Sequence, residues 1–376
     1  MVVLSTTNNA NKTEKLQLAK KELAKAFEPK TKDTTKYTAV PKDKQLTKTK
    51  EFAEAGLEEL KKGTVAVITL AGGQASRLDT NAPKGTVKIN DKSLFELQKE
   101  RLEKINKETK KVIPWIILTS EATNAETIKF FETKIKYPKT FFIIQESLPA
   151  LDKQGNPIVT KENDKDSIFY APNGNGDVFN AMEKSGKFEF FKKEGINYFH
   201  VITVDNALVK PADPYLIGAA KIKGADAISK TVTKKNEKEK VGLFAFDEEK
   251  KLTVVEYTEA TDKTNTTDKT KEFKEANIAN HLFTLDFMKK VATTKTLPYH
   301  VAEKKIKTEK DHVSGIKLEK FIFDALKFAE KPFILVVERE TEFSPVKNID
   351  GEDSIKSAKK DLEQVKPKDE VDKFYF

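Results

Sequence analysis

After Gly63 the sequence alternates short apolar runs with stretches of helical periodicity, and this alternation limits the possible folds more than any other feature of the chain. Apolar runs of strand length lie at 64–70, 115–118, 140–145, 198–204 and 225–232. Strands that alternate with helices form a largely parallel sheet covered by helices. Two further runs, at 241–246 and 252–257, are separated by a short polar turn and predict an antiparallel hairpin. We therefore predict a doubly wound α/β fold with a mixed sheet.

The regions that flank this alternation are shorter and differ in character. Apolar residues recur at helical spacing at 11–27 and 47–62, and Gly63 is suited to end the second helix. After the main region, a helical pattern returns only at 354–365. We predict an N-terminal helical arm at 1–62, a main domain at 63–348 and a short C-terminal tail at 349–376.

Local signals inside the main domain mark one helix start and two loops. Ser93 and Glu96 have the spacing of a capping box, which predicts a helix that begins after Ser93. Polar segments without periodicity at 152–166 and 258–271 predict surface loops.

Composition excludes several classes of chemistry. The chain has no cysteine, so disulfides, thiolate zinc sites and thiol nucleophiles are excluded, and a metal must use oxygen ligands or one of four histidines. The 68 basic and 59 acidic residues are interspersed, which favours a solvated surface over a nucleic-acid interface. Because there is no apolar run of membrane-spanning length and the first fifteen residues are polar, we predict a cytoplasmic protein without a membrane partner.

The strongest functional signal is the segment that follows the first predicted strand. The strand at 64–70 runs into Ala71-Gly72-Gly73-Gln74, and Arg77 and Lys84 follow. Glycines at such a junction let backbone N–H groups approach a polyphosphate, and the two cations can neutralise charge that develops on it. The pattern is neither G-x-G-x-x-G nor a P-loop, and taken alone it also fits an ordinary tight turn.

Further motifs follow in order along the main domain. With the glycine segment they resemble the eukaryotic UDP-N-acetylglucosamine pyrophosphorylases, which belong to the UDPGP family of sugar-nucleotide uridylyltransferases. The resemblance covers about 63–348, and the later motifs are the specific ones. It implies a Rossmann-like, GT-A-like nucleotidyltransferase fold with an N-terminal helical arm and a truncated C-terminal region. The matching segments are 173–176, 204–206, 241–242, 254–257, 277–281, 315–321 and 342–348.

The resemblance also implies a reaction. UTP and N-acetylglucosamine 1-phosphate would give UDP-N-acetylglucosamine and pyrophosphate, with Mg²⁺ or Mn²⁺ as cofactor. A phosphate oxygen of the sugar attacks the α-phosphorus in line, so the protein supplies positioning and cations and needs no nucleophile of its own. Two alternatives stay open: a catalytically impaired homologue that binds uridine nucleotides, and a pyrophosphorylase for glucose or galactose 1-phosphate. The sequence does not fix the oligomeric state.

The same resemblance assigns roles to individual residues, and each residue has a simpler structural explanation. The cations could be ordinary surface residues, Asp205 could cap a turn, and Gln145 or Gly174 could merely end a strand or form a turn. His281 is predicted to be structural. The implied roles are catalytic for Arg77, Lys84 and Lys347, nucleotide-binding for Leu70, Ala71, Gly72, Gly73, Gln145 and Gly174, sugar-binding for Asn175, Gly242, Glu256 and Asn280, and metal-binding for Asp205.

Two residues depart from the family pattern inside the glycine segment. Ala75 and Asp79 stand where the family usually has glycine. If position 75 required a positive φ, the methyl group would cost about 1 kcal/mol or more. An acid close to the triphosphate would repel it. We expect Asp79 to point outward and Ala75 to tolerate its backbone conformation.

Overall fold

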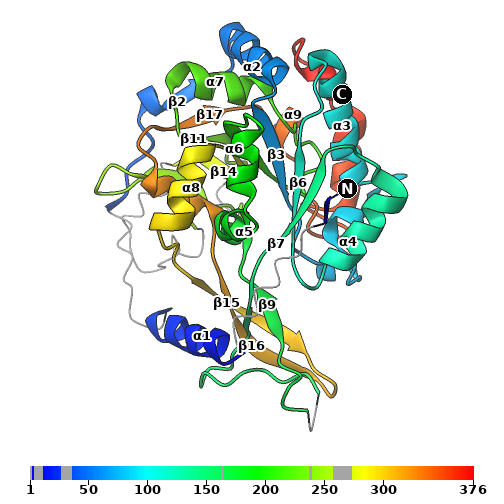
Figure 1. Cartoon of the computed structure of the whole chain (residues 1–376), viewed down its shortest axis with the longest axis vertical. Helices are drawn as coiled ribbons and strands as arrows, with labels where there is room; N and C mark the ends of the chain where they lie inside the picture. The colour runs from blue at the N-terminus through cyan, green and yellow to red at the C-terminus, as the bar shows by residue number, and fades with distance from the viewer. Residues whose placement is uncertain (1, 4–11, 27–35, 162–163, 237–238, 257–272) are drawn as a thin grey trace.

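A computed structural model of the chain describes residues 2–3, 12–26, 36–161, 164–236, 239–256 and 273–376 (Figure 1). The predicted loop at 258–271 lies outside these residues. The strands are β1 Val2–Val3, β2 Gln45–Thr47, β3 Val65–Leu70, β4 Lys88–Ile89, β5 Lys92–Ser93, β6 Trp115–Thr119, β7 Thr140–Ile144, β8 Ser147–Pro149, β9 Tyr170–Pro172, β10 Tyr198–Thr203, β11 Ala227–Thr233, β12 Leu243–Phe246, β13 Leu252–Val255, β14 Glu275–Thr284, β15 His300–Lys307, β16 His312–Glu319 and β17 Pro332–Val336. The α-helices are α1 Lys12–Ala26, α2 Lys50–Lys62, α3 Leu94–Thr109, α4 Asn124–Phe130, α5 Val178–Lys184, α6 Lys187–Lys193, α7 Pro214–Lys223, α8 Leu285–Thr294, α9 Arg339–Glu342 and α10 Ile355–Gln364.

A mixed sheet forms the centre of the molecule. Its strands run in the order β1-β7-β6-β3-β10-β14-β11-β17-β2. The pairs along this order are parallel except those of β14, which runs antiparallel to β10 and to β11. The five predicted strands are β3, β6, β7, β10 and β11, and the predicted hairpin is β12 and β13, so these predictions are confirmed.

The strand β14 was not predicted. It lies between β10 and β11, and His281 is opposite Val201 on one side and Ser229 on the other. Its sequence mixes apolar residues with Asn277, Asn280 and His281, so it lacks the apolar run that marks the other central strands. Polar residues in the middle of a sheet require partners that sequence alone does not reveal.

Helices cover both faces of the sheet, as expected for a doubly wound fold. Apolar residues of α2, α3 and α7 form the core on one face, and those of α5, α6 and α8 form the core on the other. The helices α2 and α7 pack closely (Figure 1). Gly56 permits this contact, since a Cβ at this position would lie 1.9 Å from the Pro214 carbonyl oxygen. The predicted helix end at Gly63 and the capping box of Ser93 and Glu96 are both present.

A small lobe projects from the carboxyl side of the sheet (Figure 1). It consists of the pairs β8–β9 and β15–β16, and α1 lies against it through a cluster of apolar residues. The N-terminal helix therefore contacts this lobe. No helix in the described ranges is long and apolar enough to cross a bilayer.

The residues after Asn348 pack on the main body. The predicted helix at 354–365 is α10, whose N-terminus is capped by Ser354. Tyr375 is buried, and its hydroxyl lies 3.1 Å from the carbonyl oxygens of Pro211 and Ala212. This part of the chain thereby contacts the segment that follows β10.

Candidate active site

The glycine segment folds back on itself at the carboxyl end of β3. The Ala71 N–H donates to the Leu118 carbonyl oxygen at 2.8 Å, which ties the segment to β6. The Lys84 N–H donates to the Gly73 carbonyl oxygen at 3.1 Å, which closes the loop. Gly73 itself faces open space, because a Cβ at this position would meet no atom within 4 Å. Leu70 to Gly73 therefore present backbone at the end of a central strand.

Gln145 crosses directly over Gly72. A Cβ on Gly72 would lie 2.0 Å from the Gln145 Nε2, so a side chain at this position would displace the Gln145 amide. Gln145 is 5% exposed, and its Oε1 is buried without a hydrogen-bond partner among the described residues. A buried acceptor of this kind requires a partner, and the N–H of a ligand can supply it.

A small cavity adjoins Gln145. Its volume is about 30 Å³, and Lys15 of α1 and Lys184 of α5 line it together with Gln145. A volume of this size holds about one water molecule. A pyrimidine ring can enter only if side chains at the rim of the cavity move. Lys184 pairs with Glu146 but is exposed, so its side chain can move into solvent. No sequence pattern indicated Lys15 or Lys184 as site residues.

Lys84 and Asp205 form an ion pair between the ends of β3 and β10. The Lys84 Nζ lies 2.8 Å from the Asp205 Oδ2, and the two side chains are 20% and 24% exposed. Burial would raise the pKa of the Asp205 carboxyl, but Lys84 and the more distant Lys347 outweigh burial and hold that pKa below its ordinary value. The two residues were predicted separately, one for phosphate and one for metal, and the structure brings them together.

Lys347 approaches the same edge from a late segment of the chain. The Val346 N–H donates to the Asp205 carbonyl oxygen at 2.9 Å, so Lys347 follows directly after a residue bound to Asp205. Its Nζ lies 2.8 Å from Asp353 Oδ2. Arg77 is exposed on the 3-10 helix Ser76–Leu78 of the glycine segment.

Gly174 and Asn175 are wedged against the segment that follows β16. Gly174 has φ 84°, and a Cβ there would lie 2.5 Å from the Lys320 carbonyl oxygen, so both conformation and space demand glycine. The Asn175 Oδ1 accepts the Ile322 N–H at 2.9 Å. The Asn175 oxygen is therefore used within the protein, which leaves its amide nitrogen for a ligand.

The four predicted sugar-binding residues have different surroundings. A Cβ on Gly242 would lie 2.9 Å from Glu256 Oε1, so these two are neighbours. Asn280 is 1% exposed, its Oδ1 lies 2.7 Å from His200 Nε2, and its Nδ2 is buried without a hydrogen-bond partner among the described residues. The residue of β14 that reaches Gly242 is Asn277, whose N–H donates to the Gly242 carbonyl oxygen at 2.9 Å.

Burial along β14 explains this difference. Ala276, Ile278 and Asn280 are buried, whereas Asn277 between them is half-buried. The Asn277 side-chain oxygen accepts the Ala279 N–H at 2.9 Å. Both asparagines belong to one motif, and the sequence does not show which of them lies beside Gly242.

His281 is enclosed in the sheet. Its Nδ1 lies 2.7 Å from the Ser229 Oγ, and burial lowers the pKa of its imidazole to about 3. The ring is therefore neutral at physiological pH. This environment fits the structural role predicted for His281.

Both departures from the family pattern are accommodated. Ala75 has φ −87° and is buried, so its methyl group occupies an ordinary conformation. Asp79 has φ 55° and is exposed at the end of the 3-10 helix Ser76–Leu78. Aspartate is among the residues that tolerate the left-handed region best.

The residues at this edge fit a magnesium ion that takes most of its ligands from substrate. Among the described residues, no group of three or more His, Asp or Glu side chains is arranged to hold a metal. Asp205 offers a carboxylate there whose pKa is held below its ordinary value, mainly by Lys84. Mg²⁺ is commonly held by one or two carboxylates together with phosphate oxygens and waters. Mg²⁺ therefore does not need a site made only of protein ligands.

A larger cavity, of about 680 Å³, lies at the carboxyl end of β17 and contains none of the predicted site residues. Its basic lining residues are each paired with an acid: Lys48 with Glu342, Lys235 with Glu352, Arg339 with Glu239 and Lys368 with Glu338. The glycine segment, Gln145 and Asp205 all lie outside this cavity. The edge around Lys84 and Asp205 is therefore the better candidate for the site.

Known proteins resemble this chain in sequence and in fold. The family model of UTP–glucose-1-phosphate uridylyltransferase, UDPGP, matches residues 10–367. The UDP-N-acetylglucosamine pyrophosphorylase of Saccharomyces cerevisiae is 36% identical over 81% of this chain and 69% of its own length. UDP-N-acetylglucosamine diphosphorylase 1 of Arabidopsis thaliana is 36% identical over 79% of this chain and 63% of its own length. The crystal structure of the Trypanosoma brucei uridine diphosphate N-acetylglucosamine pyrophosphorylase with an inhibitor superposes with a TM-score of 0.78 at 29% identity, over 93% of this chain and 75% of that one.

Proposed function

From the premise that this chain belongs to the UDPGP family of uridylyltransferases, we propose that it converts UTP and N-acetylglucosamine 1-phosphate to UDP-N-acetylglucosamine and pyrophosphate. The single observation that carries the proposal is the meeting of Lys84 and Asp205 beside the glycine segment. Ligands of open α/β sheets bind at the carboxyl ends of the strands, and the pair lies at such an end, between β3 and β10.

The residues divide into a phosphate region and a base region. Lys84, Arg77 and Lys347 would bind phosphates, with Arg77 on the exposed side where pyrophosphate leaves. Gln145, supported by Gly72, would pair with the uracil through its free Oε1. UTP bound in this way would have its α-phosphorus between the uracil at Gln145 and the three cations.

The sugar would bind on the side of β14 and the small lobe. Glu256 can accept hydrogen bonds from sugar hydroxyls, and the free amide nitrogens of Asn175 and Asn277 can donate to an N-acetyl oxygen. We propose Asn277, in place of Asn280, as the β14 residue of this group. Polar residues of this kind select against a sugar that leaves them unpaired.

The chemical step needs no group of the protein to become bonded to substrate. An oxygen of the sugar phosphate forms a bond to the α-phosphorus, and the bond from that phosphorus to the bridging oxygen of pyrophosphate breaks. The protein holds both substrates in line and opposes the charge on the leaving oxygens. Asp205 would hold Mg²⁺, which when bound adds a further positive charge against the phosphates.

The test is an assay of pyrophosphate release with UTP and three sugar 1-phosphates: N-acetylglucosamine, glucose and galactose. We expect kcat/KM to be highest for N-acetylglucosamine 1-phosphate and activity to require Mg²⁺. Equal kcat/KM for glucose 1-phosphate would reject the proposed sugar. Tight binding of UDP-N-acetylglucosamine without turnover in either direction would favour the impaired homologue, although the backbone at Ala75 and Asp79 gives no reason to expect it.

A further inference from the structure

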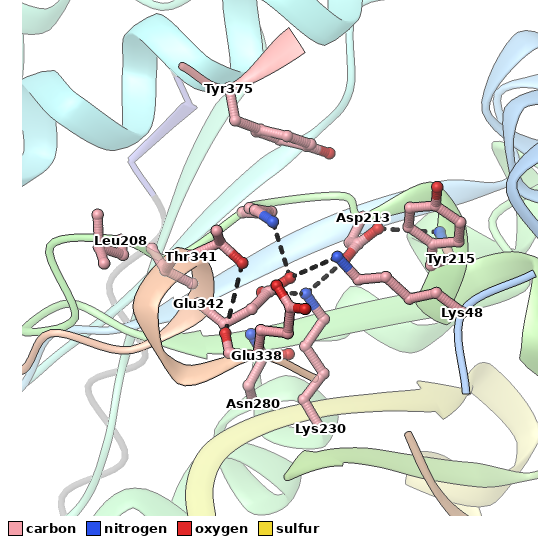
Figure 2. Close-up of polar contacts among 12 residues, drawn as sticks. Lys48, Leu208, Asp213, Tyr215, Lys230, Asn280, Glu338, Thr341, Glu342 and Tyr375 are labelled. Carbon is pink, nitrogen blue, oxygen red and sulfur yellow. Dashed lines mark hydrogen bonds and ion pairs between the residues drawn. The ribbon is translucent and has the colours of Figure 1, made fainter. Parts of the chain in front are cut away.

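A cluster of buried charges surrounds Glu342 (Figure 2). Glu342 is fully buried at its centre and accepts hydrogen bonds from Lys210 at 2.8 Å and from Lys230 at 2.6 Å, and Lys48 lies 3.2 Å away. Asp213 pairs with Lys230, and Asp372 accepts from Lys210 at 2.6 Å. Opposite charges buried together in this way hold one another in place, and removal of one member leaves the others uncompensated.

The cluster joins parts of the chain that are far apart in sequence. Lys48 precedes α2, Lys230 lies on β11, Asp213 caps α7, and Glu342 ends α9. Figure 2 shows these four side chains converging on one point. Glu342 therefore fixes the late segment that begins at α9 against three other elements.

The backbone that follows Glu342 runs directly to the phosphate region. The Glu342 carbonyl oxygen accepts a hydrogen bond from Asn206 Nδ2 at 2.7 Å. The Asn206 Oδ1 accepts the Ser344 N–H at 2.9 Å, and the Ala207 N–H donates to the Ser344 carbonyl oxygen at 2.9 Å. With the bond from Val346 to Asp205, these contacts lock the segment at 342–346 onto the turn at 205–207.

Neither Asp205 nor Lys347 lies on a helix or strand. Their positions therefore depend on this ladder of hydrogen bonds, which begins at the buried carboxylate. We propose that Glu342, held by Lys48, Lys210 and Lys230, is a positioning residue that sets Lys347 and Asp205 for phosphate transfer. The expected effect on kcat rests on the proposed function, whereas the expected effect on the position of the segment at 342–346 does not.

The test compares two buried carboxylates. Glu342→Gln removes the central charge and keeps the shape. Glu59→Gln is the matched control, because Glu59 is 3% exposed and accepts from Thr64 Oγ1 at 2.8 Å at the opposite end of β3 from the glycine segment. Both variants are expected to lower the Tm. At a temperature where both are folded, only Glu342→Gln should lower kcat, by tenfold or more, with the KM for UTP changed less than threefold because Gln145 is unaffected.

A second measurement does not depend on turnover. Hydrogen–deuterium exchange at 205–209 and 343–348 should become at least tenfold faster in Glu342→Gln and stay within twofold of wild type in Glu59→Gln. Glu342→Asp, which keeps the charge, should give intermediate values for exchange and kcat. If Glu342→Gln does not fold, Lys48→Gln removes a partner whose side chain is 20% exposed and should accelerate exchange at 343–348.

The outcomes separate the two proposals. A wild-type protein that forms no UDP-sugar would refute the proposed function, while the exchange rates still test the role of Glu342. Wild-type exchange and kcat in folded Glu342→Gln, or equal changes in Glu59→Gln, would overturn the positioning role and leave Glu342 as an anchor of the fold alone.

Discussion

Replacing Lys84 by methionine removes one cation from the phosphate region and keeps the length of the side chain. The Lys84 Nζ lies 2.8 Å from Asp205 Oδ2, and the side chain is 20% exposed. Removal of one preorganised charge or donor that acts on the transition state lowers kcat by about 10²–10³, or about 2.7–4 kcal/mol. A partly exposed ion pair contributes only about 1 kcal/mol or less to stability. The effect on rate should therefore exceed the effect on folding.

Lys99→Met is the matched control. The Lys99 Nζ also lies 2.8 Å from a carboxylate, that of Glu103 on α3, and its side chain is 23% exposed. Initial rates of pyrophosphate release at saturating substrates measure kcat, and thermal unfolding followed by circular dichroism measures stability. We expect both variants to lose similar stability, and only Lys84→Met to lose kcat.

The same variant changes the dependence on pH. Lys84 is the main charge that opposes the effect of burial on Asp205, so its removal raises the pKa of that carboxyl. The ionised form exists above its pKa and is lost as the pH falls through it. The acid limb of kcat/KM should therefore move to higher pH in Lys84→Met. A variant that keeps more than a third of the wild-type kcat, or an acid limb that does not move, would refute the reasoning.

Three further substitutions test other parts of the structure. Asp79→Gly should raise the free energy of unfolding by about 0.5–1 kcal/mol, because φ is 55° at this position, and change kcat by only a small factor; a less stable variant in urea unfolding would contradict this. Asn277→Ala should raise the KM for the sugar 1-phosphate about tenfold at nearly unchanged stability. Asn280→Ala should instead lower stability by about 1–3 kcal/mol, since it leaves His200 without its partner. Steady-state kinetics and urea unfolding of both variants would reveal the reverse assignment.

The sequence predicted those parts of the fold that depend on local pattern. The strand before Ala71 and the start of α3 follow from an apolar run and from a capping box, and both are present in the structure. Lys84 could be selected because it follows the glycine segment in a family motif, and Asp205 because it directly follows the predicted strand at 198–204. Their direct contact could not be predicted, since it depends on β3 and β10 being neighbours in the sheet.

Features that depend on tertiary partners were missed. Our proposal of Asn277 in place of Asn280 depends on which residue of β14 meets Gly242 and which meets His200, and these contacts have no sequence signal. Glu342 belongs to a motif that the sequence singled out, but its role depends on lysines from distant segments. Lys15 reaches the cavity beside Gln145 only because α1 packs on the small lobe.

The order of strands in the sheet bears on how the molecule assembles. The strands β3, β6 and β7 are neighbours in the sheet, and the half of the sheet that carries the glycine segment and Gln145 forms through the crossovers at 71–114 and 120–139. At the other edge, β2 pairs with β17, and most of the main domain lies between them in sequence. Closing so long a loop is slow, because its entropy is lost before the contacts form. The nucleotide half is therefore expected to fold first, and the phosphate region to be completed last.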